Sequence, residues 1–228
     1  MQQYFVENEL KTNDVIELED DIIYHLTKVL RSTNKTFRLV DKNHNVFIAN
    51  LLDNSKAKIV SKLDENNELD CDITVILALI KSDKFELTIQ KLTELGVKRI
   101  IPYNAKRSMV KETKTDKKLL RYKKILMEAS EQSHRNVIPE ILPAIDLKDI
   151  VKYKSDLNII AYEKDDDVSK SFKAKSITII IGPEGGFEEN EYQEIVKMGF
   201  KSVSLGKRIL RAETAALYLT SIIVGDNQ

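Results

Sequence analysis

From residue 70 onward, apolar runs typical of strands alternate with amphipathic segments typical of helices, and this order constrains the fold strongly. The run Ile73–Leu79 is apolar except for Thr74, as expected for a strand that is covered on both faces. Further strands are expected at 97–103, 157–162, 176–181 and 202–205, and helices at 83–95, 116–132, 188–198 and 212–224. This order predicts an α/β fold, a mainly parallel sheet with helices on both faces.

The first 70 residues have a different character. Short β segments at 4–6, 15–18, 37–40, 46–49 and 57–60 are separated by turns rich in Asn and Asp. One helix is expected over 20–30, where Ile22, Ile23 and Leu26 have helical spacing. The pattern predicts a small β-barrel over residues 1–70, followed by a larger domain over 71–228.

Composition excludes several classes of protein. Cys71 is the only cysteine, so the chain forms no internal disulfide and suits a reducing compartment. Residues 1–6 lack the basic and apolar regions of a signal peptide, and the longest apolar run, 73–80, is too short to span a bilayer. A cytoplasmic protein is therefore predicted. The three histidines are not spaced as metal ligands, so no metal site is expected.

The charge is balanced overall but unevenly distributed. The chain has 36 basic and 36 acidic residues, yet residues 98–124 contain 11 basic and 2 acidic ones, a local charge of +9. Such a patch on a neutral protein favours a specific contact with RNA. A solvated helix face next to a charged loop is the alternative interpretation.

A glycine-rich loop, Gly182-Pro183-Glu184-Gly185-Gly186, directly follows the apolar run 177–181. Ligands of parallel sheets bind beyond the carboxyl ends of the strands, and glycines let a ligand approach the backbone closely. A turn that needs positive φ is the alternative. Acidic residues at 184, 188, 189 and 191 disfavour phosphate at the following helix start. A nucleoside-type cofactor without phosphate, such as S-adenosyl-L-methionine (SAM), fits better.

A second glycine-containing loop, 204–211, also lies between a short strand and a helix. Two loops at adjacent strand ends can hold one ligand between them. Arg211 and Glu213 are charged residues in an otherwise apolar segment, where charge is costly unless it is paired or used. They are either functional or a local ion pair at the start of the last helix. The apolar stripe of that helix indicates either core packing or a dimer surface.

Five segments together resemble a known family. They are 25–31 (His-Leu-Thr-Lys-Val-Leu-Arg), 91–97, 128–135, 182–187 and 205–215. In order and spacing they are similar to those of the bacterial 16S ribosomal RNA uridine nitrogen-3 methyltransferases, of the SPOUT superfamily, over essentially the whole chain. Two departures concern the RNA-contacting part: Tyr24 replaces a frequent second histidine, and residues 32–35 lack the usual glycine.

The resemblance implies a fold and partners that the pattern alone does not give. It implies an N-terminal PUA-like RNA-binding barrel, a C-terminal SPOUT parallel sheet with a deep trefoil knot, and a homodimer that binds SAM in the knot loops. The cofactor-binding residues carried over by motif are Gly182, Glu184, Gly185, Gly186, Leu205, Gly206, Ile209 and Leu210. Ala161 and Tyr162, at the end of the first strand of the implied knot, are expected to join them.

The implied reaction is SAM-dependent methylation of nitrogen-3 of a specific uridine in 16S rRNA, in the assembled or assembling small ribosomal subunit. Cationic donors would stabilise the anion formed when the imide loses its proton. The catalytic candidates are Arg211, Arg135, Glu184 and Glu213. The RNA-binding candidates are Lys28, Arg31, Lys106, Arg107 and Arg135. A knotted methyltransferase for another RNA position and a non-catalytic rRNA-binding assembly factor are the competing interpretations.

Overall fold

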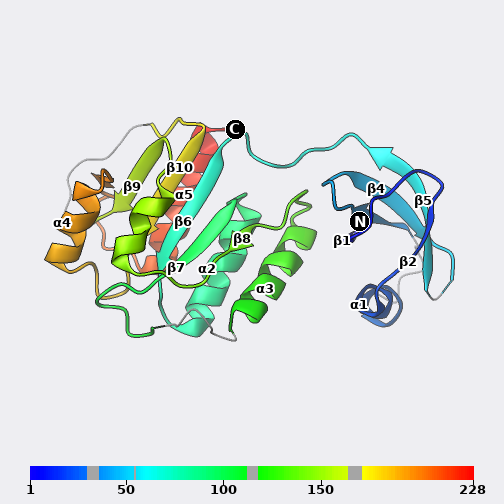
Figure 1. Cartoon of the computed structure of the whole chain (residues 1–228), viewed down its shortest axis with the longest axis horizontal. Helices are drawn as coiled ribbons and strands as arrows, with labels where there is room; N and C mark the ends of the chain where they lie inside the picture. Colours follow the sequence, from blue (N-terminus) through cyan, green and yellow to red (C-terminus); the bar gives the residue numbers. More distant parts are fainter. Residues whose placement is uncertain (30–35, 54, 112–117, 164–170) are drawn as a thin grey trace. The chain divides into compact units, whose positions relative to one another are not determined.

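The computed structural model describes residues 1–29, 36–53, 55–111, 118–163 and 171–228 (Figure 1). The chain forms two compact units, Met1–Glu68 with Ser130–Val137, and Leu69–Ala129 with Ile138–Gln228. We describe each unit by itself. Arg31, one of the predicted RNA contacts, and the departure from the family at 32–35 lie outside the described residues.

The first unit contains a five-stranded mixed sheet with strand order β1-β3-β4-β5-β2. Its elements are β1 (Gln3–Phe5), β2 (Val15–Glu17), α1 (Asp20–Tyr24), the π-helical turn η1 (His25–Val29), β3 (Thr36–Val40), β4 (Val46–Leu51) and β5 (Lys56–Leu63). Only β1 and β3 pair in parallel. Among the described residues, β1 and β2 do not pair with each other, so the sheet is a curled half-barrel where the sequence predicts a barrel.

The second unit contains a six-stranded parallel sheet with strand order β11-β9-β10-β6-β7-β8. Its elements are β6 (Asp72–Ala78), α2 (Ser82–Glu94), β7 (Arg99–Tyr103), α3 (Lys118–Gln132), β8 (Glu140–Ile141), the 3-10 helix η2 (Leu147–Tyr153), β9 (Leu157–Ala161), β10 (Ser176–Ile181), α4 (Glu189–Lys197), β11 (Lys201–Val203) and α5 (Ala212–Asp226). The predicted α/β class is confirmed, and β10 has the predicted bounds.

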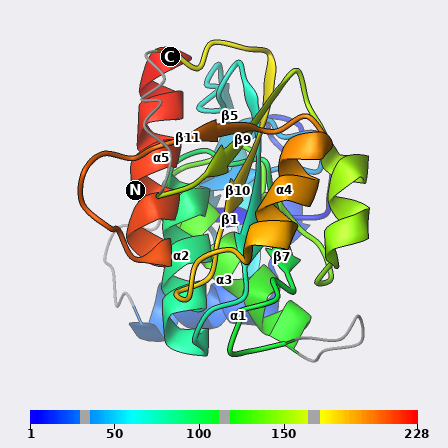
Figure 2. The same cartoon turned by 90° about the vertical axis from the view of Figure 1, so that its left-hand side faces the viewer.

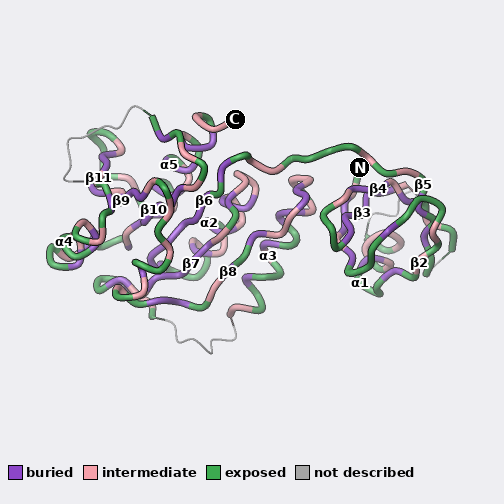
Figure 3. Tube along the Cα trace, turned by 45° about the horizontal axis from the view of Figure 1, so that its top comes forward, coloured by how far each residue is buried: buried purple, intermediate pink, exposed green. Residues whose placement is uncertain are grey.

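Successive residues of the central strands enter two different cores. Ile179 of β10 packs in the core that α2 and α5 cover, whereas Ile180 packs in the core that α4 and η2 cover. Figure 2 shows α2 and α5 on one side of the sheet and α4 on the other. Burial on both faces explains the continuous apolar runs of the sequence, and Figure 3 shows the buried residues along β6 and β7.

The last helix confirms the core-packing interpretation of its apolar stripe. The residues of α5 that are buried are Ala212, Ala215, Ala216, Leu219, Thr220, Ile223 and Val224. Tyr218 lies outside this stripe and is 49% exposed. Within the described ranges, no helix is both long enough and apolar enough to cross a bilayer.

Candidate functional site

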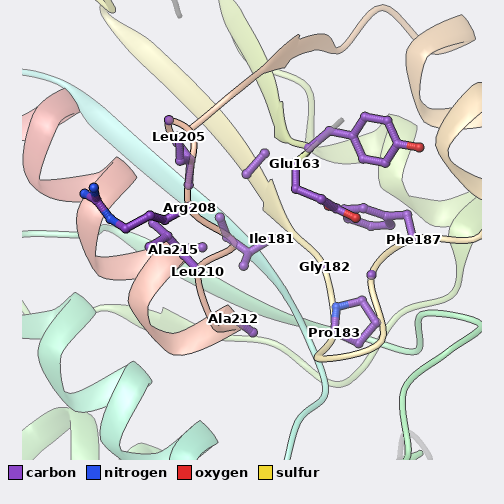
Figure 4. Close-up of a pocket in the computed structure, with 14 residues that line it drawn as sticks. Glu163, Ile181, Gly182, Pro183, Phe187, Leu205, Arg208, Leu210, Ala212 and Ala215 are labelled. Carbon is purple, nitrogen blue, oxygen red and sulfur yellow. The ribbon is translucent and has the colours of Figure 1, made fainter. Parts of the chain in front are cut away.

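Three loops at the carboxyl ends of neighbouring strands form a pocket (Figure 4). They follow β9, β10 and β11, and the start of α5 closes one side. The lining residues are Ala161, Tyr162, Glu163, Ile181, Gly182, Pro183, Gly186, Phe187, Leu205, Gly206, Arg208, Leu210, Ala212 and Ala215. The pocket encloses about 500 Å³ of space not filled by atoms, including its open mouth. Its place at the carboxyl ends of parallel strands is that of a small-molecule site.

The loop after β10 depends on its glycines. The Gly186 N–H donates to the Pro183 carbonyl oxygen at 2.9 Å, and Gly186 has φ +68°, a conformation that other residues rarely adopt. At Gly182, a Cβ atom would lie 2.8 Å from the Phe187 ring. The backbone therefore passes directly under Phe187, and that ring becomes part of the pocket wall.

Tyr162 anchors the loop after β9. Its side chain is buried, its ring stacks on Tyr192 with 3.9 Å between centroids, and its hydroxyl donates to Glu189 Oε2 at 3.2 Å. Burial, and then the hydrogen bond to Glu189, raise the pKa of Tyr162. The contacts to α4 hold the first loop against the second.

The segment after β7 supports the glycine-rich loop from its outer side. Lys106 Nζ pairs with Glu188 Oε2 at 2.9 Å, and Arg107 Nη1 donates to the Gly185 carbonyl oxygen at 3.3 Å. The ion pair raises the pKa of Lys106 and lowers the pKa of Glu188. Both basic residues are exposed, as RNA contacts must be, but each also has a partner within the protein.

The pocket contains seven of the ten residues predicted to bind the cofactor. Glu184, Gly185 and Ile209 do not line it, and Ile209 is 86% exposed. Seven lining residues were not predicted: Glu163, Ile181, Pro183, Phe187, Arg208, Ala212 and Ala215. Six of them lie within the motifs 182–187 and 205–215 or directly beside them, and Glu163 directly follows the predicted Tyr162.

Two of the predicted catalytic residues lie at the start of α5. Arg211 is its N-cap residue and is exposed, beside the pocket-lining Ala212. Glu213 Oε1 pairs with Lys84 Nζ at 3.3 Å, while its buried Oε2 has no hydrogen-bond partner among the described residues. The local pair between Arg211 and Glu213, the alternative drawn from the sequence, is absent from the described part of the chain. Glu184 is exposed in the glycine-rich loop.

Arg135 has a different placement from the one predicted. It is 4% exposed within the first unit, and its guanidinium donates to both carboxylate oxygens of Glu68, at 2.5 and 3.3 Å. A guanidinium with almost no accessible surface cannot contact RNA or a target base in this arrangement. The structure therefore gives Arg135 a structural role, as the buried partner of Glu68.

The basic stretch 98–124 is partly neutralised by the fold. Acidic side chains from other segments pair with several of its members: Lys98 with Asp72, Arg99 with Glu140, Lys106 with Glu188, and Arg121 with Glu86. Lys28, on η1 of the first unit, is exposed. No group of three His, Cys, Asp or Glu side chains in the described ranges is arranged to hold a metal ion.

The parallel sheet and its three-loop pocket define an α/β protein with a small-molecule site at its strand ends. The RNA methyltransferase domain family matches residues 67–224. Ribosomal RNA small subunit methyltransferase E of Mesomycoplasma hyopneumoniae is 36% identical to this chain, and the alignment covers 99% of this chain and 100% of that protein. The Bacillus subtilis protein of the same name is 33% identical, and the alignment covers 98% of this chain and 96% of that protein. The chain belongs to the ribosomal RNA small subunit methyltransferase E family, which confirms the family predicted from the sequence.

Solved structures agree with this assignment. The crystal structure of a ribosomal RNA small subunit methyltransferase E from Neisseria gonorrhoeae, bound to S-adenosyl methionine, has a TM-score of 0.88 and 30% identity. The comparison covers 97% of this chain and 95% of that one. A Legionella pneumophila structure in complex with SAM also has a TM-score of 0.88 and 30% identity, over 96% and 95%.

Proposed function

We propose that this chain is a SAM-dependent methyltransferase that methylates nitrogen-3 of a specific uridine in 16S rRNA of the small ribosomal subunit. The three-loop pocket carries the proposal, because it lies at the sheet edge where an α/β fold binds small molecules and contains seven of the ten residues predicted to bind the cofactor. The SAM-bound relatives with nearly full coverage support the choice of cofactor.

The residues of the pocket fit SAM. Apolar side chains such as Phe187, Leu205 and Leu210 suit the adenosine part of a ligand. At the start of α4, the Glu188 N–H donates to Glu191 Oε2 at 3.4 Å, so an acidic side chain occupies the position that a phosphate would need. SAM contains no phosphate. When bound, it would supply an electrophilic methyl group on its sulfonium.

Residues of the chain would remove the imide proton of the uridine and stabilise the resulting anion. Nitrogen-3 is a weak nucleophile until it loses its imide proton, and the resulting charge spreads onto the two neighbouring carbonyl oxygens. Arg211 is the cation we assign to that charge, because it is exposed at the pocket edge and its side chain forms no ion pair or hydrogen bond among the described residues. Arginine stays protonated, so a carboxylate such as Glu213 or Glu184 would receive the proton.

The first unit would bind the RNA. Its curled sheet and exposed Lys28 support a PUA-like RNA-binding module, and Lys106 and Arg107 would extend the contact from the second unit. The target nitrogen lies on the pairing edge of the base, so the uridine must be unpaired or flipped out. Replacing Arg107 with Ala should reduce the slope of the logarithm of the RNA-binding constant against the logarithm of the salt concentration by about one. An unchanged salt slope would remove Arg107 from the contact.

We also propose the homodimer and the trefoil knot of the family. Ile209, 86% exposed beside the pocket, and Tyr218, 49% exposed on α5, are apolar surfaces that a second copy would cover. A pocket formed by the loops after β9, β10 and β11 and by the start of α5 fits a knotted chain end. Light scattering of the purified protein would test the dimer, with a monomer mass contradicting it.

Two measurements test the function. Calorimetric titration with SAM should show micromolar binding that Gly186→Arg abolishes, because the new side chain would fill the pocket. Small subunits that lack the modification should then gain one methyl group per 16S rRNA, read as a stop in reverse transcription, since a methyl on nitrogen-3 blocks base pairing. A methyl group at another position would favour a different RNA specificity, and SAM binding without transfer would favour an assembly factor.

A further inference from the structure

The charged residues of the pocket lie at its open side. Among the fourteen lining residues, only Glu163, Gly206 and Arg208 are exposed, and the others are half-buried or buried. Glu163 and Arg208 are the only charged members of the set. The inner walls are therefore neutral, and the mouth carries one carboxylate and one guanidinium.

The reacting part of the cofactor must face this mouth. The substrate of the proposed function is a nucleotide within a large RNA, which reaches the pocket only from the solvent side. The methyl group, and the sulfonium that carries it, must therefore lie where the exposed lining residues are. The neutral, more buried walls are left for the adenosine part.

Glu163 is placed to act on that positive sulfur. Its Oε1 lies 3.2 Å from the position of a Cβ on Gly186, so the carboxylate sits directly over the glycine-rich turn. Figure 4 shows Glu163 and Phe187 on the same side of the pocket, with Arg208 on the opposite side and directed away. Glu163 forms no ion pair with any residue of the described ranges, so its charge remains available to a ligand.

We propose that Glu163 gives the pocket its preference for the cationic cofactor over the demethylated product, S-adenosylhomocysteine. This inference rests on the proposed function. SAM carries a sulfonium, whereas the product carries a neutral thioether and is otherwise the same molecule. A carboxylate near the sulfur attracts only the first, so the attraction disappears as the methyl group leaves, and product release is favoured.

The test compares affinities for the two ligands. Dissociation constants for SAM and S-adenosylhomocysteine are measured by calorimetry for the wild-type protein, Glu163→Gln, Glu163→Asp and the control Glu194→Gln. Glu194 is an exposed carboxylate on α4 that does not line the pocket. Glu163→Gln should weaken SAM binding about fivefold and leave product binding unchanged. Glu163→Asp keeps the charge and should keep most of the preference, and the control should keep all of it.

Other results would overturn the inference. Equal weakening of both ligands would mean that the carboxylate bonds to a group common to them, such as the ribose hydroxyls. Unchanged affinities would mean that Glu163 does not act on the ligand. A wild-type protein that binds neither ligand would instead contradict the proposed function, so the two failures are distinguishable. Thermal unfolding of each variant confirms that the comparison is made between folded proteins.

Discussion

The hydroxyl of Tyr103, at the end of β7, donates a hydrogen bond to Oε1 of Glu191, in the first turn of α4. Glu191 is completely buried, and the same oxygen accepts the Lys106 N–H at 2.9 Å. A buried carboxylate is costly unless donors surround it. This bond therefore attaches the helix that follows the glycine-rich loop to β7, next to the edge strand β8.

Removing the hydroxyl should destabilise the second unit. Tyr103→Phe leaves Glu191 with one donor fewer, and we expect the free energy of unfolding to fall by about 1–3 kcal/mol. Urea unfolding followed by circular dichroism measures this change. Tyr24→Phe, at a tyrosine that is 63% exposed, is the matched control and should have almost no effect. Equal effects of the two substitutions would contradict a structural role for the bond.

The same bond predicts a loss of stability at alkaline pH. Burial, and then the hydrogen bond to Glu191, raise the pKa of Tyr103 above its ordinary value of 10.0. The unfolded chain therefore releases this proton at a lower pH than the folded protein does. The stabilisation is complete below about pH 10 and decreases as the pH rises above that value. The free energy of unfolding, measured from about pH 8 to 11, should fall less steeply in Tyr103→Phe than in the wild type.

The buried ion pair of Arg135 and Glu68 should contribute far more to the free energy of unfolding than an exposed pair does. Arg135→Ala leaves the Glu68 carboxylate, whose side chain is 20% exposed, without its bidentate partner. We expect a loss of about 3 kcal/mol, somewhat below the cost for fully buried pairs because Glu68 retains some solvent. Arg99→Ala breaks the pair with Glu140, in which the two side chains are 37% and 52% exposed. The free energy of unfolding should then fall by less than about 1 kcal/mol. Thermal unfolding of the two variants gives the comparison, and similar losses would refute it.

Gly182→Ala tests the fit between the glycine-rich loop and Phe187. The new Cβ would lie 2.8 Å from the Phe187 ring, so the ring and its pocket wall must move. Overpacking of this kind costs about 1–3 kcal/mol, and we expect roughly tenfold weaker SAM binding in calorimetry. Gly225→Ala, where nothing lies within 4 Å of the added atom, should bind SAM like the wild type. Unchanged binding in Gly182→Ala would mean that Phe187 does not touch the ligand.

Arg211→Ala should separate the chemical step from cofactor binding. Arg211 is exposed and does not line the pocket, so the affinity for SAM should stay unchanged. The methylation rate should fall about 100-fold, the size of effect that one lost cationic donor has on a developing anion. Single-turnover assays on small subunits measure the rate, and Arg211→Lys should recover part of it. A wild-type rate in Arg211→Ala would exclude Arg211 from the reaction.

Much of the fold could be predicted because burial leaves a clear pattern in the sequence. The apolar run 177–181 marks a strand covered on both faces, and every predicted helix of the second unit is present. β8 and η2 were missed because two residues, or seven in a 3-10 helix, are too few to show a period. The sequence predicts a barrel where the structure has a half-barrel, because strand spacing does not reveal whether the two edge strands pair with each other.

The candidate site could be predicted only where local motifs carry it. The glycine-rich loop and the loop before α5 have recognisable spacings, and most of their residues line the pocket. Arg135 could not be placed, since its partner Glu68 lies 67 residues away and burial of an arginine leaves no local signal. Glu163 directly follows the predicted cofactor residue Tyr162, but its exposure at the pocket mouth is visible only in the fold.

The first unit is formed from two separate stretches of the chain, and this affects the order in which its parts are synthesised. This unit is not a continuous stretch of chain, because Ser130–Val137 belongs to it together with Met1–Glu68. The ribosome delivers these two parts in order, and Glu68 emerges long before Arg135. All five strands of the amino-terminal sheet lie within Gln3–Leu63 and are synthesised first, whereas the segment Ser130–Val137 follows only after residues 69–129. A gene fragment that stops at residue 68 would therefore encode the whole sheet but lack Arg135, the partner of Glu68.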